Sequence, residues 1–235
     1  MRVLYPVLVR ALVTRGRLLA MGALGAVAVL LAVLVRTSSP FDRADVAYNL
    51  VDTYGLSILV PVVALVFASA ALGDPSEDGT LVYLWLRPVP RWQLALAAGA
   101  AALTVSVPLA VLPVVVGSVI TGVGARLVIG SACATLLSAV GYTAVFCGLG
   151  LRVRRALAWG LAYLVIWEQA VARIAKGAAR ISISVTTRTL NARLAGHTPL
   201  PRNAMSLPVA IVVPAVLTVL AVALTTRSLN RGEIA

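Results

Sequence analysis

Charged residues are scarce in this chain. Of its 235 residues only 12% are charged and 60% are hydrophobic, whereas soluble globular domains carry roughly 25% charged residues. Water therefore cannot be the main solvent of the chain, and the sequence predicts an integral membrane protein. The net charge of +12 is spread between apolar runs and forms no single stripe, which favours contact with anionic lipid over binding of nucleic acid.

Residues that build metal and redox sites are almost missing. The chain has one histidine, His197, and two cysteines, Cys133 and Cys147. The cysteines form no CxxC pair and have no histidine nearby, so they are expected to pack as small apolar residues, without a zinc site or a disulfide. His197 stands in a polar segment away from any paired carboxylate, so it is expected to be a solvated loop residue.

The sequence also lacks the common motifs for hydrolysis. The phosphate-binding GxxxxGK[ST] loop needs a lysine after a glycine-rich lead, but the sole lysine, Lys176, follows Ile174 and Ala175. A serine nucleophile needs a positioned base, and the apolar runs contain no histidine or lysine. The chain is therefore not expected to be an enzyme or to carry a cofactor or metal of its own.

Long apolar runs fill most of the chain. A membrane-spanning helix needs about 20 mostly apolar residues, and six runs meet or approach that length. They cover residues 18–35, 53–73, 94–118, 127–151, 156–173 and 208–226. Pro61, Pro108, Pro113 and Pro214 lie inside them, where kinks are expected in preference to breaks. The expected fold is all-α: a polytopic membrane protein with six transmembrane helices in a single domain over residues 1–235.

Two further segments are expected to lie at the membrane surface. Residues 3–14 set Arg10 among Val, Leu and Tyr5, which predicts an amphipathic connecting helix in the interface. Residues 174–206 are too polar to span the membrane and too apolar for a plain linker. A β-strand there would leave an unpaired edge, so short interfacial or re-entrant helices are favoured, partly embedded on the outer side.

Basic residues indicate the orientation. With the N-terminus inside, the cytoplasmic segments hold eleven basic residues and the outer segments nine, six of which belong to the long 173–206 connection. Long loops weigh less than short ones in the positive-inside rule, so both termini are expected in the cytoplasm. The excess of arginine over lysine is typical of a GC-rich bacterium, which places the protein in a bacterial plasma (inner) membrane.

Glu168 interrupts the fifth apolar run, directly after Trp167. A charge near the bilayer centre is costly, so an acid inside a span is a functional candidate by default. The alternative is that the fifth helix ends early and Glu168 pairs with Arg173 or another arginine in the outer interface. Glu168 follows Ala156 by roughly 18 Å of helix, past the midplane, and both interpretations remain open.

The stretch DPSEDGTLVYLWLRPVPRW, residues 74–92, is the main polar interruption of the chain. Asp74 is placed to cap a helix that begins at Pro75, and Arg87 before Pro88 should end that helix. A plain turn between two spans needs only about five residues. The greater length favours an exposed cytoplasmic helix that docks on a soluble partner.

The motif E-D-G-T-L-x-Y-L-x-x-R-P-V-x-R within this stretch resembles the cytoplasmic loop between spans two and three of ABC type-2 exporter permeases. In that family the loop carries the coupling helix, which sits on the nucleotide-binding subunit. The resemblance implies that the following residues couple the chain to an ATPase: Glu77, Asp78, Gly79, Thr80, Leu81, Leu84, Trp85, Arg87, Pro88 and Arg91.

The layout of the whole chain is similar to the same family. The resemblance implies a permease subunit that works with a second permease copy or a paralogue, and with two separate ATPase subunits that hold the ATP and Mg. It also implies that spans one, two and five line the route, with Trp167 and Glu168 as candidate residues of an outer gate. Two other hypotheses are a non-transporting membrane scaffold and, with less support, a membrane-embedded enzyme acting on lipid-linked substrates.

Overall fold

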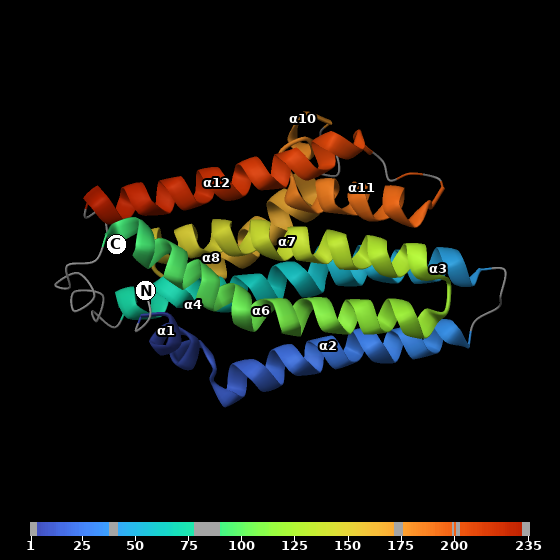
Figure 1. Ribbon diagram of the computed structural model, residues 1–235, viewed down its shortest axis with the longest axis horizontal. Helices are drawn as coiled ribbons and strands as arrows, with labels where there is room; N and C mark the ends of the chain where they lie inside the picture. Colours follow the sequence, from blue (N-terminus) through green and yellow to red (C-terminus); the bar gives the residue numbers. More distant parts are fainter. Residues whose placement is uncertain are drawn as a thin grey trace.

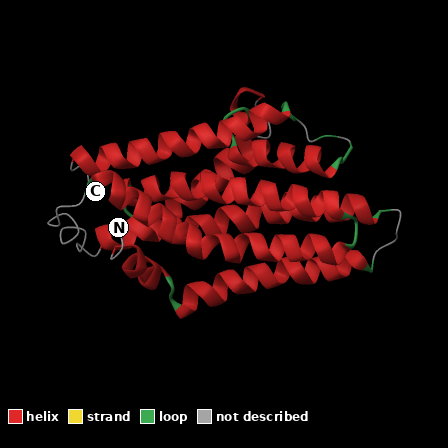
Figure 2. Ribbon diagram, viewed as in Figure 1, coloured by secondary structure: helices red, strands yellow, loops and turns green. Residues whose placement is uncertain are grey.

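The computed structural model describes residues 4–37, 42–77, 90–171, 176–198, 200 and 203–231. These residues form a bundle of long helices that run along one common direction (Figure 1). No β-strand occurs in the described part of the chain (Figure 2). The expected all-α class is therefore confirmed.

Among the described residues, five helical stretches are long and apolar enough to cross a membrane. They are Arg15–Arg36, Arg43–Pro75, Arg91–Thr121, Ala125–Arg152 and Leu207–Leu229. In the labels of Figure 1, these stretches contain α2 (Arg15–Arg36), α3 (Arg43–Asn49), α4 (Val60–Glu77), α6 (Arg91–Thr121), α7 (Ala125–Arg152) and α12 (Leu207–Arg231). A π-helix, η1 (Leu50–Leu59), joins α3 to α4, so the second crossing begins well before the expected residue 53.

The expected fifth span has a different form from the other crossings. It consists of α8 (Ala156–Ala162) and a second π-helix, η2 (Tyr163–Val171), and its apolar part ends at Glu168, too short to count among the long crossings. After the undescribed residues 172–175, the chain forms α10 (Lys176–Ala179) and α11 (Ile183–Ala195). The described part of the chain thus has five long crossings, and the fifth apolar run stops where Glu168 begins the polar region.

The bundle has two distinct ends. α1 (Leu4–Leu12) and the C-terminal end of α12 lie at one end, which we call the terminal end (Figure 1). The turn between α6 and α7 and the C-terminal end of α11 lie at the opposite, distal end. α1 packs against α6 and α4, and it buries Leu4, Leu8 and Leu12, which share one face because they are four residues apart. The short N-terminal helix is therefore docked on the bundle by one apolar face.

Proline residues lie inside the long helices without breaking them. Pro108 and Pro113 fall within α6, and Pro214 within α12. This agrees with the expectation that these prolines do not end their helices, because neighbouring groups can satisfy the freed carbonyls.

The expected helix cap at Asp74 is wrong. α4 continues through Asp74 and Pro75 to Glu77, and the Asp74 carboxylate pairs with Arg17 at the start of α2, at 2.8 Å. The reason is tertiary packing: near this point α4 lies on α7 so closely that a Cβ at Gly73 would be 3.2 Å from the Gly150 carbonyl oxygen. Residues 78–89 of the expected coupling helix lie outside the described residues.

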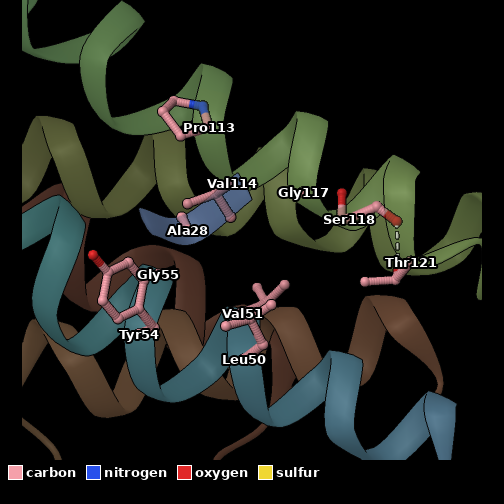
Figure 3. A pocket seen from close by; sticks show the side chains of 10 residues that line it. All are labelled: Ala28, Leu50, Val51, Tyr54, Gly55, Pro113, Val114, Gly117, Ser118 and Thr121. Atoms are coloured by element: carbon pink, nitrogen blue, oxygen red, sulfur yellow. Dashed lines mark hydrogen bonds between the residues drawn. The ribbon is translucent and has the colours of Figure 1, made fainter. Parts of the chain in front are cut away.

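Small residues bring α2, η1 and α6 together. Figure 3 shows this junction, where the space between the side chains is only about 10 Å³. A Cβ at Gly55 would lie 3.2 Å from Val114, and one at Gly25 would lie 2.7 Å from Pro113. Glycine permits such close approach of helices in a membrane, where packing replaces the hydrophobic effect as the main attraction. The first and second crossings are thereby held tightly against the third.

Candidate functional site

Each of the two π-helices in the described ranges carries one buried acid. Asp52 lies in η1 and is 3% exposed, and Glu168 lies in η2 and is 1% exposed. The wide turns of a π-helix are rare and are found frequently at functional sites. Both carboxylates bond to the same element, α11, although they are separated by more than a hundred residues in sequence. The two crossings that depart from α-geometry therefore meet at one helix.

α11 is a polar helix enclosed by apolar ones. It lies beside α7 in the distal half of the bundle (Figure 1). A Cβ at Gly141 would be 3.4 Å from Ile183 at the start of α11, and one at Gly130 would be 3.1 Å from Asn191 near its end. The two helices are thus antiparallel and in close contact. The polar residues of α11 that are buried are Ser184, Thr186, Thr187, Thr189 and Asn191.

Glu168 forms hydrogen bonds with the N-terminal end of α11. Ser182 Oγ donates to Glu168 Oε2 at 2.5 Å, and the backbone N–H of Ser184 donates to the same oxygen at 3.3 Å. The Tyr163 hydroxyl donates to Oε1 at 3.3 Å. Ser182 is also the N-cap of α11, because its Oγ accepts from the backbone N–H of Val185. A carboxylate at this position faces the positive end of the helix dipole, which stabilises it.

The surroundings of Glu168 distinguish an acid inside the bundle from an acid in the outer interface that pairs with an arginine. The residue is buried, and in the described part of the chain its partners are hydroxyl groups and one backbone N–H, not a guanidinium group. Arg173, the partner named by the interfacial interpretation, lies outside the described residues. The geometry accordingly places the acid inside the bundle, at the junction of the fifth apolar run with α11.

Asp52 forms an ion pair with Arg188 in the middle of α11. The Arg188 Nη2 and Nε atoms both approach Asp52 Oδ2, at 2.5 and 2.7 Å. The Asp52 side chain is 4% exposed and that of Arg188 is 19% exposed, so the pair is largely shielded from water. Removing one partner of a buried pair leaves an uncompensated charge, which costs about 3–5 kcal/mol. This pair therefore fixes α11 to the second crossing.

A comparison with known families supplies the identity of the bundle. The model of a family described as ABC-2 family transporter protein matches residues 14–172, more than half of the chain. The chain belongs to the ABC-2 family of transporter proteins. No curated protein matches it. The matched range includes both Asp52 and Glu168, whereas α11 lies after it.

Membership of this family makes the chain the membrane component of a transporter. The many apolar helices agree with that role, since five of them have the length and composition to cross a membrane. In this ABC-2 transporter protein the two buried acids and α11 form a polar site inside an otherwise apolar bundle. No group of three or more His, Cys, Asp or Glu side chains able to hold a metal occurs within the described ranges.

The structure places some of the other predicted site residues. Trp167 is half-buried on η2, immediately before Glu168. Glu77 ends α4 and Arg91 begins α6, so these two members of the predicted coupling set lie at the ends of helices, on either side of the undescribed part of the 74–92 loop. The members of the predicted coupling set from Asp78 to Pro88 lie outside the described residues, and their role stays a prediction.

Asp52 was missed by the sequence analysis. The sequence predicts an apolar run that begins at Thr53, which leaves Asp52 in an outer loop, whereas the helix begins at Arg43. Its partner Arg188 is 136 residues away, so no local pattern links the two. The available signal was the set of apolar residues just before it, Tyr48, Leu50 and Val51, which extends the run toward the N-terminus once Asp52 is accepted inside a helix.

His197 is not the solvated loop residue that the sequence suggests. Its ring stacks on Tyr48 with 3.8 Å between centroids, and its Nδ1 lies 3.7 Å from Asp45 Oδ1. Gly196, at φ 69°, ends α11 in the left-handed conformation that glycine adopts readily and turns the chain back toward α3. A cavity of about 330 Å³ opens beside this contact, next to the start of α7. The C-terminal end of α11 is thus also docked on the second crossing.

Proposed function

We propose that this chain is the permease subunit of an ATP-driven exporter. In this proposal two permease copies, or one copy and a paralogue, form the translocation pathway, and two separate ATPase subunits with ATP and Mg drive it. The observation that carries the proposal is the family match over residues 14–172. It is supported by the absence from the sequence of a GxxxxGK[ST] loop, because an exporter without one needs a partner that hydrolyses ATP.

Six crossings are part of the proposal. α8 lies toward the terminal end and α11 toward the distal end (Figure 1). Together, the α8–η2 stretch and α11 would make one crossing from two half-helices that meet at Glu168, where the start of α11 bonds to η2. Non-helical breaks inside a membrane are tolerated where they are buried in protein, as Ser182 is. Both termini would then be cytoplasmic and the distal end would face outward, in the plasma membrane of a bacterium.

The ATPase would dock at the terminal end, on residues 74–92. This loop leaves α4 at Glu77 and re-enters the bundle at Arg91. Two contacts link its surroundings to other helices: Arg17 at the start of α2 binds Asp74, and the Tyr5 hydroxyl of α1 bonds to the Thr104 hydroxyl of α6 at 2.7 Å. A force applied at the loop would therefore reach the first, second and third crossings together.

The outer gate would lie at the opposite end of the same helices. Glu168 and its neighbour Trp167 on η2, together with Asp52 on η1, would belong to the parts of spans five and two that line the route. α11 occupies the distal half of the bundle between these groups and α7. Motion at the terminal end would change the separation of the two π-helices and so open or close the route.

Photo-crosslinking in intact membranes tests the proposal. A photoreactive amino acid replaces Leu84 in the full tagged chain, and the control carries it at Leu220, which is exposed on α12 away from the loop. We expect Leu84 to capture a protein that contains the GxxxxGK[ST] loop, identified by mass spectrometry, and Leu220 not to do so. The purified complex should hydrolyse ATP in a vanadate-sensitive manner. Failure to recover such an ATPase at Leu84 overturns the proposal.

A further inference from the structure

We propose that α11 is a mobile plug in the outer half of the route, latched shut by the Asp52–Arg188 ion pair and seated on Glu168. This inference rests on the proposed export function, because it assumes a translocation route. The latch itself consists of contacts within this chain. Three observations carry it: the internal hydrogen bonding of α11, the origin of its two anchors, and the unpartnered polar groups that the closed position buries.

α11 satisfies most of its own buried hydroxyl groups. The hydroxyls of Thr186, Thr187 and Thr189 donate to the carbonyl oxygens of Ser182, Ile183 and Val185 within the same segment, at 2.8–2.9 Å. Among the described residues, side-chain bonds from α11 and its cap to other elements run to Asp52, Glu168 and the Met205 carbonyl. Because few polar bonds tie the helix to its surroundings, it can shift as a unit without leaving many donors unpaired.

The two anchors come from different crossings. Ser182 is bound to η2 and Arg188 to η1, and the separation of six positions between them corresponds to roughly 9 Å of rigid helix. If η1 and η2 move apart, a rigid helix cannot keep both contacts. A coupled movement of the second and fifth spans would therefore release the plug at one anchor.

The Asp52 anchor is the one suited to act as a latch. Arg188 reaches a single carboxylate oxygen, Oδ2, while Oδ1 is buried without a hydrogen-bond partner among the described residues. The Glu168 anchor, by contrast, uses both carboxylate oxygens and the helix N-terminus. Each anchor holds α11 by two contacts, because the Tyr163 bond to Glu168 stays within η2. The Arg188 side chain is 19% exposed, so its guanidinium group can reach water after separation, whereas Ser182 and Ser184 are buried.

The closed position also buries polar groups that an open route would hydrate. Neither the Oδ1 nor the Nδ2 atom of Asn191 has a hydrogen-bond partner within the described part of the chain, although the residue is fully buried. A buried amide without partners is costly. Displacement of α11 toward a water-filled space would hydrate Asn191 and offset the loss of packing against Gly130. The closed and open positions can thus be close in free energy, as a switching element requires.

Cysteine labelling of the purified full chain tests the latch. Ser184→Cys is the reporter, because its Oγ is buried and has no partner among the described residues, so the change removes no hydrogen bond. The native cysteines, Cys133 and Cys147, are both free and are replaced by alanine in this background. The latch variants are Asp52→Asn and Arg188→Gln. Arg193→Gln is the matched control, since Arg193 lies on the same helix but bonds to the exposed Met205 carbonyl.

We expect slow modification of Ser184→Cys in the parent and in the Arg193→Gln control. Asp52→Asn and Arg188→Gln should each speed it by at least about tenfold, since the labelling rate follows the population of the open position. The double variant should label no faster than the faster single variant, because both changes break the same contact. Unchanged rates in the single variants overturn the proposal.

A second background distinguishes release of α11 from general unfolding. It retains Cys147 as its one cysteine, which is buried on α7 away from α11. The labelling of Cys147 should stay slow in both latch variants. If Cys147 becomes reactive together with Ser184→Cys, the ion pair supports the whole bundle and the latch proposal is wrong.

The export function is tested separately. In proteoliposomes that hold the complex with its ATPase, ATP with vanadate should speed labelling of Ser184→Cys in the chain with the intact ion pair. If the latch variants behave as expected in the isolated chain but no ATPase complex can be assembled, the proposed exporter function fails while the latch stands. If the complex assembles and transports but the latch variants label slowly, the latch proposal fails while the exporter function stands.

Discussion

Gly150 on α7 lies directly on the backbone of Ser69 on α4. A Cβ at Gly150 would come 2.3 Å from the Ser69 carbonyl oxygen and 3.0 Å from its Cα. The Ser69 hydroxyl is turned away, toward the Leu65 carbonyl of its own helix at 2.6 Å. This crossing of two backbones brings the second and fourth spans together on the side of the bundle nearer the terminal end, and it leaves no room for a side chain.

Gly150→Ala should therefore destabilise the bundle. The added methyl group meets backbone atoms, which cannot turn aside as a flexible side chain can, so a loss of about 1–3 kcal/mol is expected. Thermal unfolding of the purified protein in detergent measures the effect. Gly99→Ala on α6 is the control, because no described residue has an atom within 4 Å of a Cβ at that position. Equal midpoints for the two variants would contradict the close packing of α4 and α7.

Ser182→Ala should weaken the seat of α11 at Glu168. The change removes the shortest bond to the carboxylate and the N-cap of the helix at once. Loss of a partner from a buried acceptor costs about 1–3 kcal/mol. Ser184→Ala is a closely matched control, since that hydroxyl is buried without a partner in the described residues and the backbone N–H to Glu168 remains. The unfolding midpoint should fall for the first variant and change little for the second.

Asp74→Asn should have little effect on stability. The Asp74 and Arg17 side chains are 48% and 27% exposed, and exposed ion pairs typically contribute about 0–1 kcal/mol. If the pair links the first and second crossings for ATP-driven motion, the ratio of transport to ATP hydrolysis should fall nonetheless. The two readouts separate the roles: a large drop in the unfolding midpoint would show that the pair is structural, whereas an unchanged ratio would remove it from coupling.

The apolar runs made most of the helices predictable, because the thickness of the hydrocarbon core sets their length. The sequence predicts helices over 18–35, 94–118, 127–151 and 208–226, and the structure has helices that contain each range. It also predicted helices in preference to a strand after Glu168, and α11 is one. Its burial could not be read from composition, because a polar helix becomes an interior element only through Gly130 and Gly141 on a distant part of α7.

The errors have a common physical origin. At Asp74 a local capping signature competes with packing of α4 on α7, and the packing prevails. At Asp52 and His197, the deciding partners are Arg188 and Tyr48, which are far away in sequence. Local patterns report the preference of a few residues for one backbone geometry. Contacts between distant segments decide where a polar side chain finally lies, and a single sequence does not display them.

Polar substitution in the predicted docking helix should uncouple ATP hydrolysis from transport. Leu84→Asp or Trp85→Asp would place a charge where the resemblance puts an apolar contact with the ATPase, and a charge in such an interface is costly unless it is paired. We expect the complex to assemble less well, or to hydrolyse ATP without moving cargo, while the unfolding midpoint of the isolated chain stays unchanged. Leu220→Asp is not a suitable control, since α12 is an expected membrane span.

The matched control is a substitution elsewhere on the terminal end, Arg154→Ala, in the turn between α7 and α8. This position shares the expected cytoplasmic side with the loop but lies outside the predicted coupling set. The measurement is the ratio of transported cargo to hydrolysed ATP in proteoliposomes of the complex, with size-exclusion chromatography to follow assembly. The ratio should hold for Arg154→Ala and fall for both loop variants. If the ratio stays unchanged with a charge at Leu84 and at Trp85, residues 74–92 only connect two spans and do not couple the chain to the ATPase.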